Sequence, residues 1–537
     1  MSQREAAAQD SPARPRLDAD VRRWLVVVLV AGLVLRIAAH LDLATLPYFL
    51  LPQTDAAAYD DGARRVAAGD LALVDQVAGM GPGYFYFLGG VYALLGDGPF
   101  VIRGVQTLIG LGAVLCIFFA ATRLLAPRAA LLPAALAAAY APSLFYESQL
   151  LGDGIALALH ALALLLLLRA RERRTAGRFV ALGLALGTAA LFRPSALGLL
   201  LPVGVVALTR GGRSGLRAPA AFGLAVVGAS LAIMPITARN VLVAREPVLL
   251  TGHGGINLWI GNGPGATGAF RVTPEVPDAD EPGACFREFR EAAGAALGHP
   301  ASIAETDRYW TRRTLAHALA HPLDVARVLA RKAHLYWNGR ELSDVYRYEF
   351  LRDRSVALQR LPGYFLVAPF ALLGLAIALR APRDSAAHAL AWFALAEMIA
   401  IVAVLVSSRY RLVTLPPLFV LAGLGVSALA SRLRAADIAR SARFRALAPL
   451  VVVLVAGVAL AWPVRARPAV ADGCVDLARV WLAVGDLDAA REAYAEALAA
   501  DPAHPVARAG AAALAERLRR IDEQTRLRGA PSPTPPR

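Results

Sequence analysis

The first long apolar run of the chain reads WLVVVLVAGLVLRIAAHLDL, from Trp24 to Leu43. About 20 helical residues cross the hydrocarbon core of a bilayer, so a run of this length predicts a transmembrane helix. The run is too long for the apolar stretch of a signal peptide and lacks a small-residue cleavage site. It therefore indicates an uncleaved signal anchor, with the polar residues 1–23 as a cytoplasmic N-terminal tail.

The composition of the whole chain agrees with a membrane protein. Apolar residues make up 57% of the 537 residues, against roughly 45 to 50% in soluble globular proteins. The formal net charge is +15, and Lys332 is the single lysine, so the basic residues are almost all arginine. They gather between the apolar runs, as the positive-inside rule requires of cytoplasmic loops. Membrane orientation thus explains the charge, and no nucleic-acid partner is expected.

Arginine placement also decides how many runs cross the membrane. Apolar length alone gives about twelve candidate spans, one of them near 83–97. If that aromatic, glycine-bearing run crossed, the N-terminus would face the side opposite to all the arginine-rich connectors. We therefore predict a helix at the membrane interface there. The remaining runs, about eleven in number, lie at 24–43, 100–122, 129–146, 151–168, 178–192, 195–209, 218–238, 362–379, 386–406, 411–430 and 446–464.

This topology predicts an all-α polytopic membrane domain over residues 24–464, with extracytoplasmic segments at 44–98 and 239–361. A helical segment at 465–525 follows on the same side, and a disordered tail at 526–537. The helical segment matches one tetratricopeptide repeat, which is a candidate binding surface for a protein partner, although a plain helical hairpin also fits. The matching residues are Trp481, Gly485, Ala490, Tyr494, Ala497 and Pro502.

The first extracytoplasmic segment holds a candidate catalytic acid. It reads QTDAAAYDDGARRVAAGD from Gln53 to Asp70, and a helix beginning at Asp55 would place Asp55, Tyr59 and Gly62 on one face. Two interpretations of Asp55 stay open on this pattern alone. It is either a helix N-cap at the start of a solvated acidic turn, or a catalytic carboxylate held just above the bilayer.

A series of short motifs resembles the GT-C glycosyltransferases. Within that superfamily the chain is most similar to the family 39 group, which holds the protein O-mannosyltransferases and the bacterial aminoarabinose transferases. The resemblance covers about residues 20–465. Its motifs are the Asp55 to Asp70 segment, Gly81-Pro-Gly-Tyr84, Leu151-Gly-Asp153, Leu191-Phe-Arg-Pro194, Arg239-Asn240, the Asn257 to Phe270 glycine loop, His321-Pro322 and Ser408-Arg-Tyr-Arg411.

The resemblance implies transfer of a sugar from a polyprenyl-phosphate donor to an acceptor on the extracytoplasmic face, with inversion at the anomeric carbon. It implies three kinds of site residue: catalytic Asp55, Asp60 and Asp153; donor-phosphate-binding Arg193, Arg239, Arg409 and Arg411; and substrate-loop Tyr59, His253, Asn257 and Asn262. Alanine follows Asp55 where the protein mannosyltransferases carry glutamate. Metal binding and protein acceptors are therefore not supported by the residues, no cofactor is required, and a divalent metal stays open.

Other interpretations remain beside this one. Each arginine alone also fits a side chain that snorkels to lipid headgroups, and Asp153 also fits an N-cap. Glu397 and His160 lie inside predicted spans, where they either bond between helices or handle protons or substrate. A transporter of lipid-linked sugars, or a scaffold displaying the C-terminal repeat, are the alternative functions. The alanine- and arginine-rich composition favours a bacterial cell membrane, with the N-terminus cytoplasmic and the C-terminus extracytoplasmic.

Overall fold

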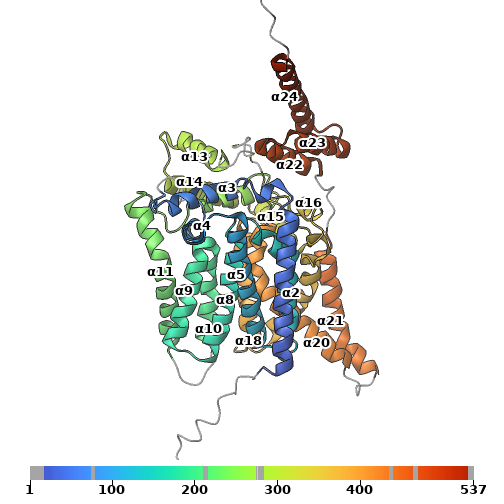
Figure 1. The fold of residues 1–537 in the computed structure, drawn as a ribbon. Helices are drawn as coiled ribbons and strands as arrows, with labels where there is room; N and C mark the ends of the chain where they lie inside the picture. The colour runs from blue at the N-terminus through green and yellow to red at the C-terminus, as the bar shows by residue number, and fades with distance from the viewer. Residues whose placement is uncertain are drawn as a thin grey trace, which may run out of the picture.

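The computed structural model describes residues 17–73, 79–209, 216–271, 273, 275, 284–434, 440–463 and 470–529. Over these residues every regular element is a helix, and most of the helices stand side by side in one bundle (Figure 1). The predicted all-α architecture is confirmed.

Among the described residues, seven helical segments are long and apolar enough to cross a membrane. They are α2 (Ala19–Leu43), α5 (Pro99–Ala121), α8 (Asp153–Glu172), α11 (Ala218–Leu242), α17 (Tyr364–Arg380) with the turn η3 (Leu358–Arg360), α18 (Ala386–Val404), and the unit of α19 (Ser408–Arg411), η4 (Leu412–Thr414) and α20 (Leu415–Arg434). Shorter apolar helices are α9 (Ala176–Phe192), η2 (Pro194–Leu199) with α10 (Leu200–Leu208), and the Leu447–Ala461 part of α21 (Arg440–Ala461). The chain is a multi-pass membrane protein, and the exact number of crossings stays a prediction.

The predicted run 129–146 is a broken helix instead of a continuous one. It forms α6 (Leu131–Ala139) and α7 (Ala141–Glu147), separated by an extended residue, Tyr140. The cause is Pro142, which has no N–H to donate to the carbonyl four residues earlier and whose ring clashes with it. That carbonyl, on Ala138, accepts a hydrogen bond of 3.0 Å from Arg36 of α2 instead.

The two long segments predicted to lie outside the membrane meet at one end of the bundle (Figure 1). The first contains η1 (Pro47–Phe49), α3 (Asp55–Ala67) and α4 (Pro82–Leu95); the second contains α12 (Gly254–Asn262), α13 (Ala284–Leu297), α14 (Ile303–Ala320), α15 (Pro322–Trp337) and α16 (Tyr348–Arg352). α3 and α4 pack closely, since a Cβ on Gly89 would lie 2.5 Å from the Cβ of Val66. These segments form a cap over that end of the bundle.

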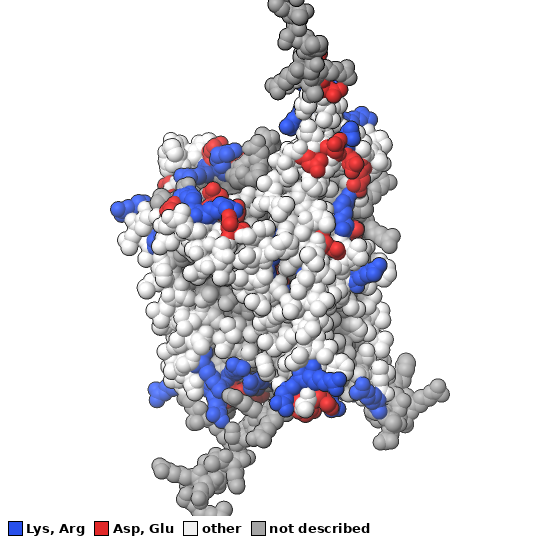
Figure 2. Space-filling view, viewed as in Figure 1, with Lys and Arg blue, Asp and Glu red and all other residues white. Residues whose placement is uncertain are grey.

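Arginine gathers at the opposite end of the bundle, at the bottom of Figure 2. Ion pairs tie several connectors together there. Arg128, after α5, lies 3.2 Å from Asp20 at the start of α2, and Arg123 lies 2.5 Å from Glu172 at the end of α8. The first helix of the described chain therefore begins at the arginine-rich end.

The C-terminal segment forms three helices, α22 (Val470–Val484), α23 (Leu487–Ala500) and α24 (Pro505–Gly529), beyond the cap (Figure 1). Ala490, Tyr494 and Ala497 are buried in its small core. The segment docks on the cap, because Arg347 lies 2.7 Å from Asp476 and Phe350 packs on Gly473. α24 continues to Gly529, so helix replaces the first part of the tail predicted from 526; residues 530–537 lie outside the described part. The tetratricopeptide assignment stays a prediction.

Candidate active site

A cavity of about 130 Å³ opens where the cap meets the bundle. Its walls come from α3, from the ends of α8 and α9, from the second capping segment and from α19. The polar and aromatic residues that line it are Asp55, Tyr59, Asp153, Phe192, Arg193, Thr251, His253, Asn257, Phe286, Arg409 and Tyr410. Most of the side chains that the family resemblance implied as site residues therefore face one space.

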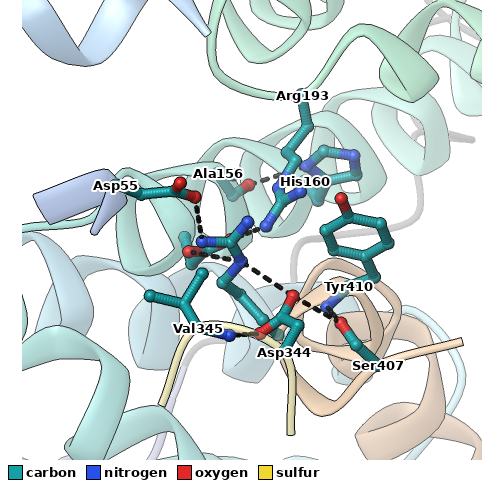
Figure 3. Close-up of polar contacts among 10 residues, drawn as sticks. Asp55, Ala156, His160, Arg193, Asp344, Val345, Ser407 and Tyr410 are labelled. Atoms are coloured by element: carbon teal, nitrogen blue, oxygen red, sulfur yellow. Dashed lines mark hydrogen bonds and ion pairs between the residues drawn. The ribbon is translucent and has the colours of Figure 1, made fainter. Parts of the chain in front are cut away.

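Arg409 stands at the centre of this cavity's polar wall. Its Nη1 donates to Asp55 Oδ2 at 2.8 Å, and its Nε faces Asp344 Oδ2 at 3.3 Å and Asp153 Oδ2 at 3.7 Å. Figure 3 shows Asp55 and Asp344 reaching this group from different sides. A second guanidinium, on Arg193, pairs with the other oxygen of Asp153. Three carboxylates thus share two guanidiniums, which leaves one excess negative charge when all are ionised.

Asp55 is the first residue of α3 and does not cap it. The N-cap position is Thr54, and no side chain bonds the free N–H groups there. Thr54 has φ 51°, a left-handed conformation that is strained for a β-branched residue. Strained backbone of this kind is concentrated at functional sites. The structure therefore removes the N-cap interpretation and aims the Asp55 carboxylate at Arg409.

Aromatic packing against α4 fixes the position of α3 beside the cavity. The ring of Tyr59 lies 4.9 Å from that of Tyr84 and 4.7 Å from that of Phe85, both on α4. Burial, reinforced by the charge of Asp55, raises the pKa of Tyr59 above its usual value. Tyr59 is therefore a neutral hydroxyl beside Asp55 throughout the physiological pH range.

Arg193 enters the cavity from the turn between α9 and η2. The start of α4 packs against that turn so tightly that a Cβ on Gly81 would lie 2.7 Å from the carbonyl oxygen of Phe192. The guanidinium of Arg193 lies over the ring of Tyr410, 4.3 Å from its centroid, while it pairs with Asp153. Asp153 begins α8 without capping it, so the N-cap interpretation of Asp153 also fails.

The loop that carries Arg409 is pinned from the cap. The N–H of Val406 donates to the carbonyl of Gly268 at 2.9 Å, and the N–H of Ser408 donates to that of Leu342 at 2.8 Å. Ser407 caps the short α19 by accepting from the N–H of Tyr410. The position of Arg409 therefore depends on the second capping segment as well as on α18 and α20.

The outer wall of the cavity is more apolar. His253 stacks on Phe286 with ring centroids 3.6 Å apart and an angle of 7° between the planes. Burial lowers the pKa of His253 to about 3, so the imidazole is neutral near pH 7. Asn257, one turn into α12, provides an amide on the same wall. This wall offers a stacking surface and neutral polar groups, without a charge.

Four of the implied site residues do not line the cavity. Arg411 is buried in the bundle, where it pairs with Glu341 at 2.7 Å and donates to the carbonyl of Asn338 at 2.6 Å. In a helical turn, residues two apart point about 200° away from each other, so Arg409 and Arg411 cannot share one phosphate. We therefore leave Arg411 out of the proposed site.

The other three residues connect parts of the cap. Arg239 donates to the carbonyl of Ala72 at 2.7 Å. Asp60 accepts from the hydroxyl of Tyr92 at 2.6 Å, which ties α3 to α4. Asn262 accepts from Lys332 at 2.7 Å. Since their polar groups are used within the fold, these residues are also left out of the proposed site.

Asp344 and Tyr410 are site residues that the sequence analysis did not identify. Asp344 follows α15 in a stretch without regular structure and belongs to none of the quoted motifs. Tyr410 stands inside the Ser408 to Arg411 motif, in which only the two neighbouring arginines were predicted to bind the donor phosphate. Its ring under Arg193 is typical of a cation–π contact.

Two ionisable residues, His160 and Glu397, face each other inside the bundle. His160 Nε2 of α8 lies 3.8 Å from Glu397 Oε1 of α18, and His160 Nδ1 lies 2.7 Å from the carbonyl of Ala156. At 3.8 Å the two side chains form no hydrogen bond, and neither carboxylate oxygen of Glu397 has a hydrogen-bond partner in the described part of the chain. The predicted hydrogen bonding of both residues between helices is therefore wrong, because His160 bonds within its own helix, as Figure 3 shows.

Comparison with known proteins gives one family. Residues 80–238 match the model of the family described as dolichyl-phosphate-mannose-protein mannosyltransferase. No curated protein matches the chain. Similar solved structures include AglB, the oligosaccharyltransferase of Archaeoglobus fulgidus in complex with an inhibitory peptide and a dolichol-phosphate, with 14% identity and a TM-score of 0.44 over 88% of this chain and 59% of that one.

ArnT of Cupriavidus metallidurans bound to undecaprenyl phosphate has 17% identity and a TM-score of 0.36 over 92% of this chain and 77% of that one. The present chain thus spans 59% of the length of the archaeal enzyme. The family match confirms the resemblance that the sequence motifs indicate: residues 80–238 of this all-helical membrane protein are similar to the family of dolichyl-phosphate-mannose-protein mannosyltransferases.

Proposed function

We propose that this chain is a membrane glycosyltransferase that moves a sugar from a polyprenyl-phosphate donor to an acceptor hydroxyl, with inversion at the anomeric carbon. The observation that carries the proposal is the cavity in which Asp55 lies beside two arginines, Arg193 and Arg409. The matching family is described by a donor of this chemical class, dolichyl-phosphate-mannose. The side chains supply both a base and cations for a leaving phosphate.

The reaction follows from these groups. The acceptor hydroxyl oxygen forms a bond to C1 of the sugar as the bond from C1 to the phosphate oxygen breaks, and the phosphate leaves with the bonding electron pair. The hydroxyl proton passes to Asp55, which releases it to solvent afterwards. A positioned base contributes about 10² to 10⁴-fold in rate. Arginine stabilises the leaving phosphate, because its planar fork binds two oxygens at once while negative charge develops on them.

The proposed orientation places the cap and the C-terminal helices on the extracytoplasmic side of a bacterial cell membrane. The arginine-rich end in Figure 2, where Arg128 meets Asp20, then faces the cytoplasm in accord with the positive-inside rule. The C-terminal helices are then available to a protein partner outside. Alkaline phosphatase fused after Gly529 is expected to be active if the C-terminal helices lie outside the cytoplasm. An inactive fusion would indicate the opposite orientation.

Transfer is tested with the purified chain in nanodiscs, incubated with a panel of labelled polyprenyl-phosphate sugars and a membrane extract. Label should move to an acceptor with wild-type protein and drop by at least about 10²-fold with Asp55→Asn. Asp61→Asn is the matched control, since it removes one carboxylate from the exposed side of the same helix. Full transfer by Asp55→Asn would contradict the role of Asp55 as base.

A further inference from the structure

Three carboxylates surround the guanidinium of Arg409. Asp55 holds Nη1 at 2.8 Å, while Asp344 and Asp153 face Nε. The Arg409 side chain is only 10% exposed, so little of the guanidinium is open to the cavity. A donor phosphate that binds the guanidinium of Arg409 must therefore take a position that a carboxylate already occupies.

The three carboxylates differ in how firmly they are held. Asp153 is 4% exposed and also pairs with Arg193. Asp344 is 8% exposed, accepts from the hydroxyl of Ser407 at 3.1 Å and from the N–H of Val345 at 2.7 Å, and lies behind Arg409. Asp153 and Asp344 are therefore each held in place by contacts other than the one to Arg409.

Asp55 is held by Arg409 alone. It lines the cavity, its side chain is 27% exposed, and no second hydrogen bond or ion pair joins it to any described residue. Of the three carboxylates, Asp55 thus loses the fewest contacts when it leaves Arg409. Water in the cavity can replace the hydrogen bond that Asp55 accepts from Arg409.

Charge favours that exchange. Three carboxylates and two guanidiniums already leave one negative charge in excess, and a sugar phosphodiester adds another. A phosphate next to an unmoved Asp55 would place two anions side by side in a partly dry site, where like charges repel strongly. If Asp55 turns away from Nη1, the phosphate gains a guanidinium and the two anions separate.

We propose that the donor phosphate replaces Asp55 on Arg409, so that donor binding itself frees the carboxylate that acts as base. The inference rests on the proposed function and deepens it. While Asp55 is paired with Arg409, its Oδ2 is not available to an acceptor hydroxyl. Donor binding therefore frees this oxygen of the base, which favours a reaction order with the donor first.

The exchange is tested by binding, without any sugar or acceptor. The full chain in nanodiscs is titrated with undecaprenyl phosphate, and the same measurement is made with Asp55→Asn. Since the variant no longer competes for Arg409, it should bind the lipid phosphate about 10-fold more tightly than wild type. Undecaprenol, which has no phosphate, should bind both proteins equally, and Asp61→Asn should behave like wild type. Asp55→Ser repeats the charge removal with a smaller side chain.

The outcomes separate the two proposals. Equal or weaker binding of undecaprenyl phosphate by both Asp55 variants, with undecaprenol binding intact, would overturn the exchange. A gain that undecaprenol shows as well would overturn it too, because the phosphate would not be the cause. Tighter phosphate binding together with undiminished sugar transfer by Asp55→Asn would uphold the exchange and overturn the assignment of Asp55 as base.

Discussion

Two arginines of one short helix have opposite surroundings. Arg409 lies at the cavity among three carboxylates, one of which, Asp153, also pairs with Arg193. Arg411, two residues on, is buried with a single carboxylate, Glu341, and its two terminal nitrogens also donate to backbone carbonyls such as that of Asn338. The carboxylates around Arg409 outnumber the guanidiniums, and a bound ligand can change this balance of charge. Arg411 has a closed set of partners that a ligand cannot reach.

A second pair inside the bundle supports this distinction. Arg36 of α2 lies 2.6 Å from Glu147 of α7, with side chains 1% and 3% exposed. Its Nη1 also donates to the carbonyls of Gly32 and Ala138. Like Arg411, this arginine is buried and matched one to one with a carboxylate. Matched buried pairs join helices of the bundle, whereas the unmatched cluster lies where chemistry is expected.

The largest expected effect comes from breaking a matched pair. Glu341→Gln should lower the free energy of unfolding by about 3 to 5 kcal/mol, because it leaves the Arg411 charge buried without its counterion. Thermal unfolding of the protein in detergent, together with the amount of folded protein in the membrane, measures the loss.

Asp344→Asn is the matched control at the cavity. Arg409 keeps Asp55 and Asp153 in that variant, so the folded amount should stay near wild type. The double variant Glu341→Leu with Arg411→Met should recover only part of the stability, since the carbonyls of Asn338 and Arg340 lose their donor. Equal loss in Glu341→Gln and Asp344→Asn would remove the distinction between the two regions.

The cavity cluster was largely predictable from sequence, because its members stand in motifs with an order that fits the topology. Asp55, Asp153, Arg193 and Arg409 are up to 354 residues apart, yet the predicted topology placed all four at the same side of the membrane. The motifs could not predict the direction in which each side chain points. Whether Arg409 or Arg411 faces the cavity depends on the phase of a four-residue helix whose N-cap is Ser407.

Other features lacked a sequence signal. Asp344 lies in a turn without periodicity, and only the fold of the second capping segment brings it behind Arg409. The break between α6 and α7 was missed because the run 129–146 is apolar throughout, although Pro142 was a visible cause. The span count depends on length, since three apolar helical segments of the described chain are shorter than the seven long ones: Ala176–Phe192, Pro194–Leu208 and Leu447–Ala461.

A moderate effect is expected from the ring between the two arginines. Tyr410→Leu should raise the KM for the donor about threefold, because a cation–π contact of about 0.5 to 1 kcal/mol with Arg193 is lost. Tyr410→Phe keeps the ring face and should retain the wild-type KM. Initial rates at varied concentrations of lipid-linked sugar measure both variants. The same rise in KM for both would assign the effect to the hydroxyl instead.

The last prediction concerns a third kind of buried cation, one without any carboxylate beside it among the described residues. Lys332 of α15 is fully buried, and its Nζ donates to Asn262 Oδ1 at 2.7 Å and to the carbonyl of Val404 at 2.6 Å. Because burial disfavours the charged ammonium, the pKa of Lys332 is lowered from 10.5 to about 8. Neutral oxygens alone therefore hold this charge at the junction of α12, α15 and α18.

The sign of the resulting pH dependence is fixed. Between about pH 8 and 10.5 the unfolded chain keeps the lysine proton while the native protein has lost it, so the contribution of Lys332 to stability rises with pH in that window. Since Lys332 is the single lysine, ¹³C labelling of lysine Cε gives one NMR signal, expected to titrate near pH 8. Wild type should also gain thermal stability relative to Lys332→Met as the pH rises from 7 to about 9.5. A titration midpoint near pH 10.5 would contradict this prediction, because the oxygens of Asn262 and Val404 would then stabilise the ammonium as well as water does. A buried cation in this fold would in that case stay charged without a carboxylate beside it.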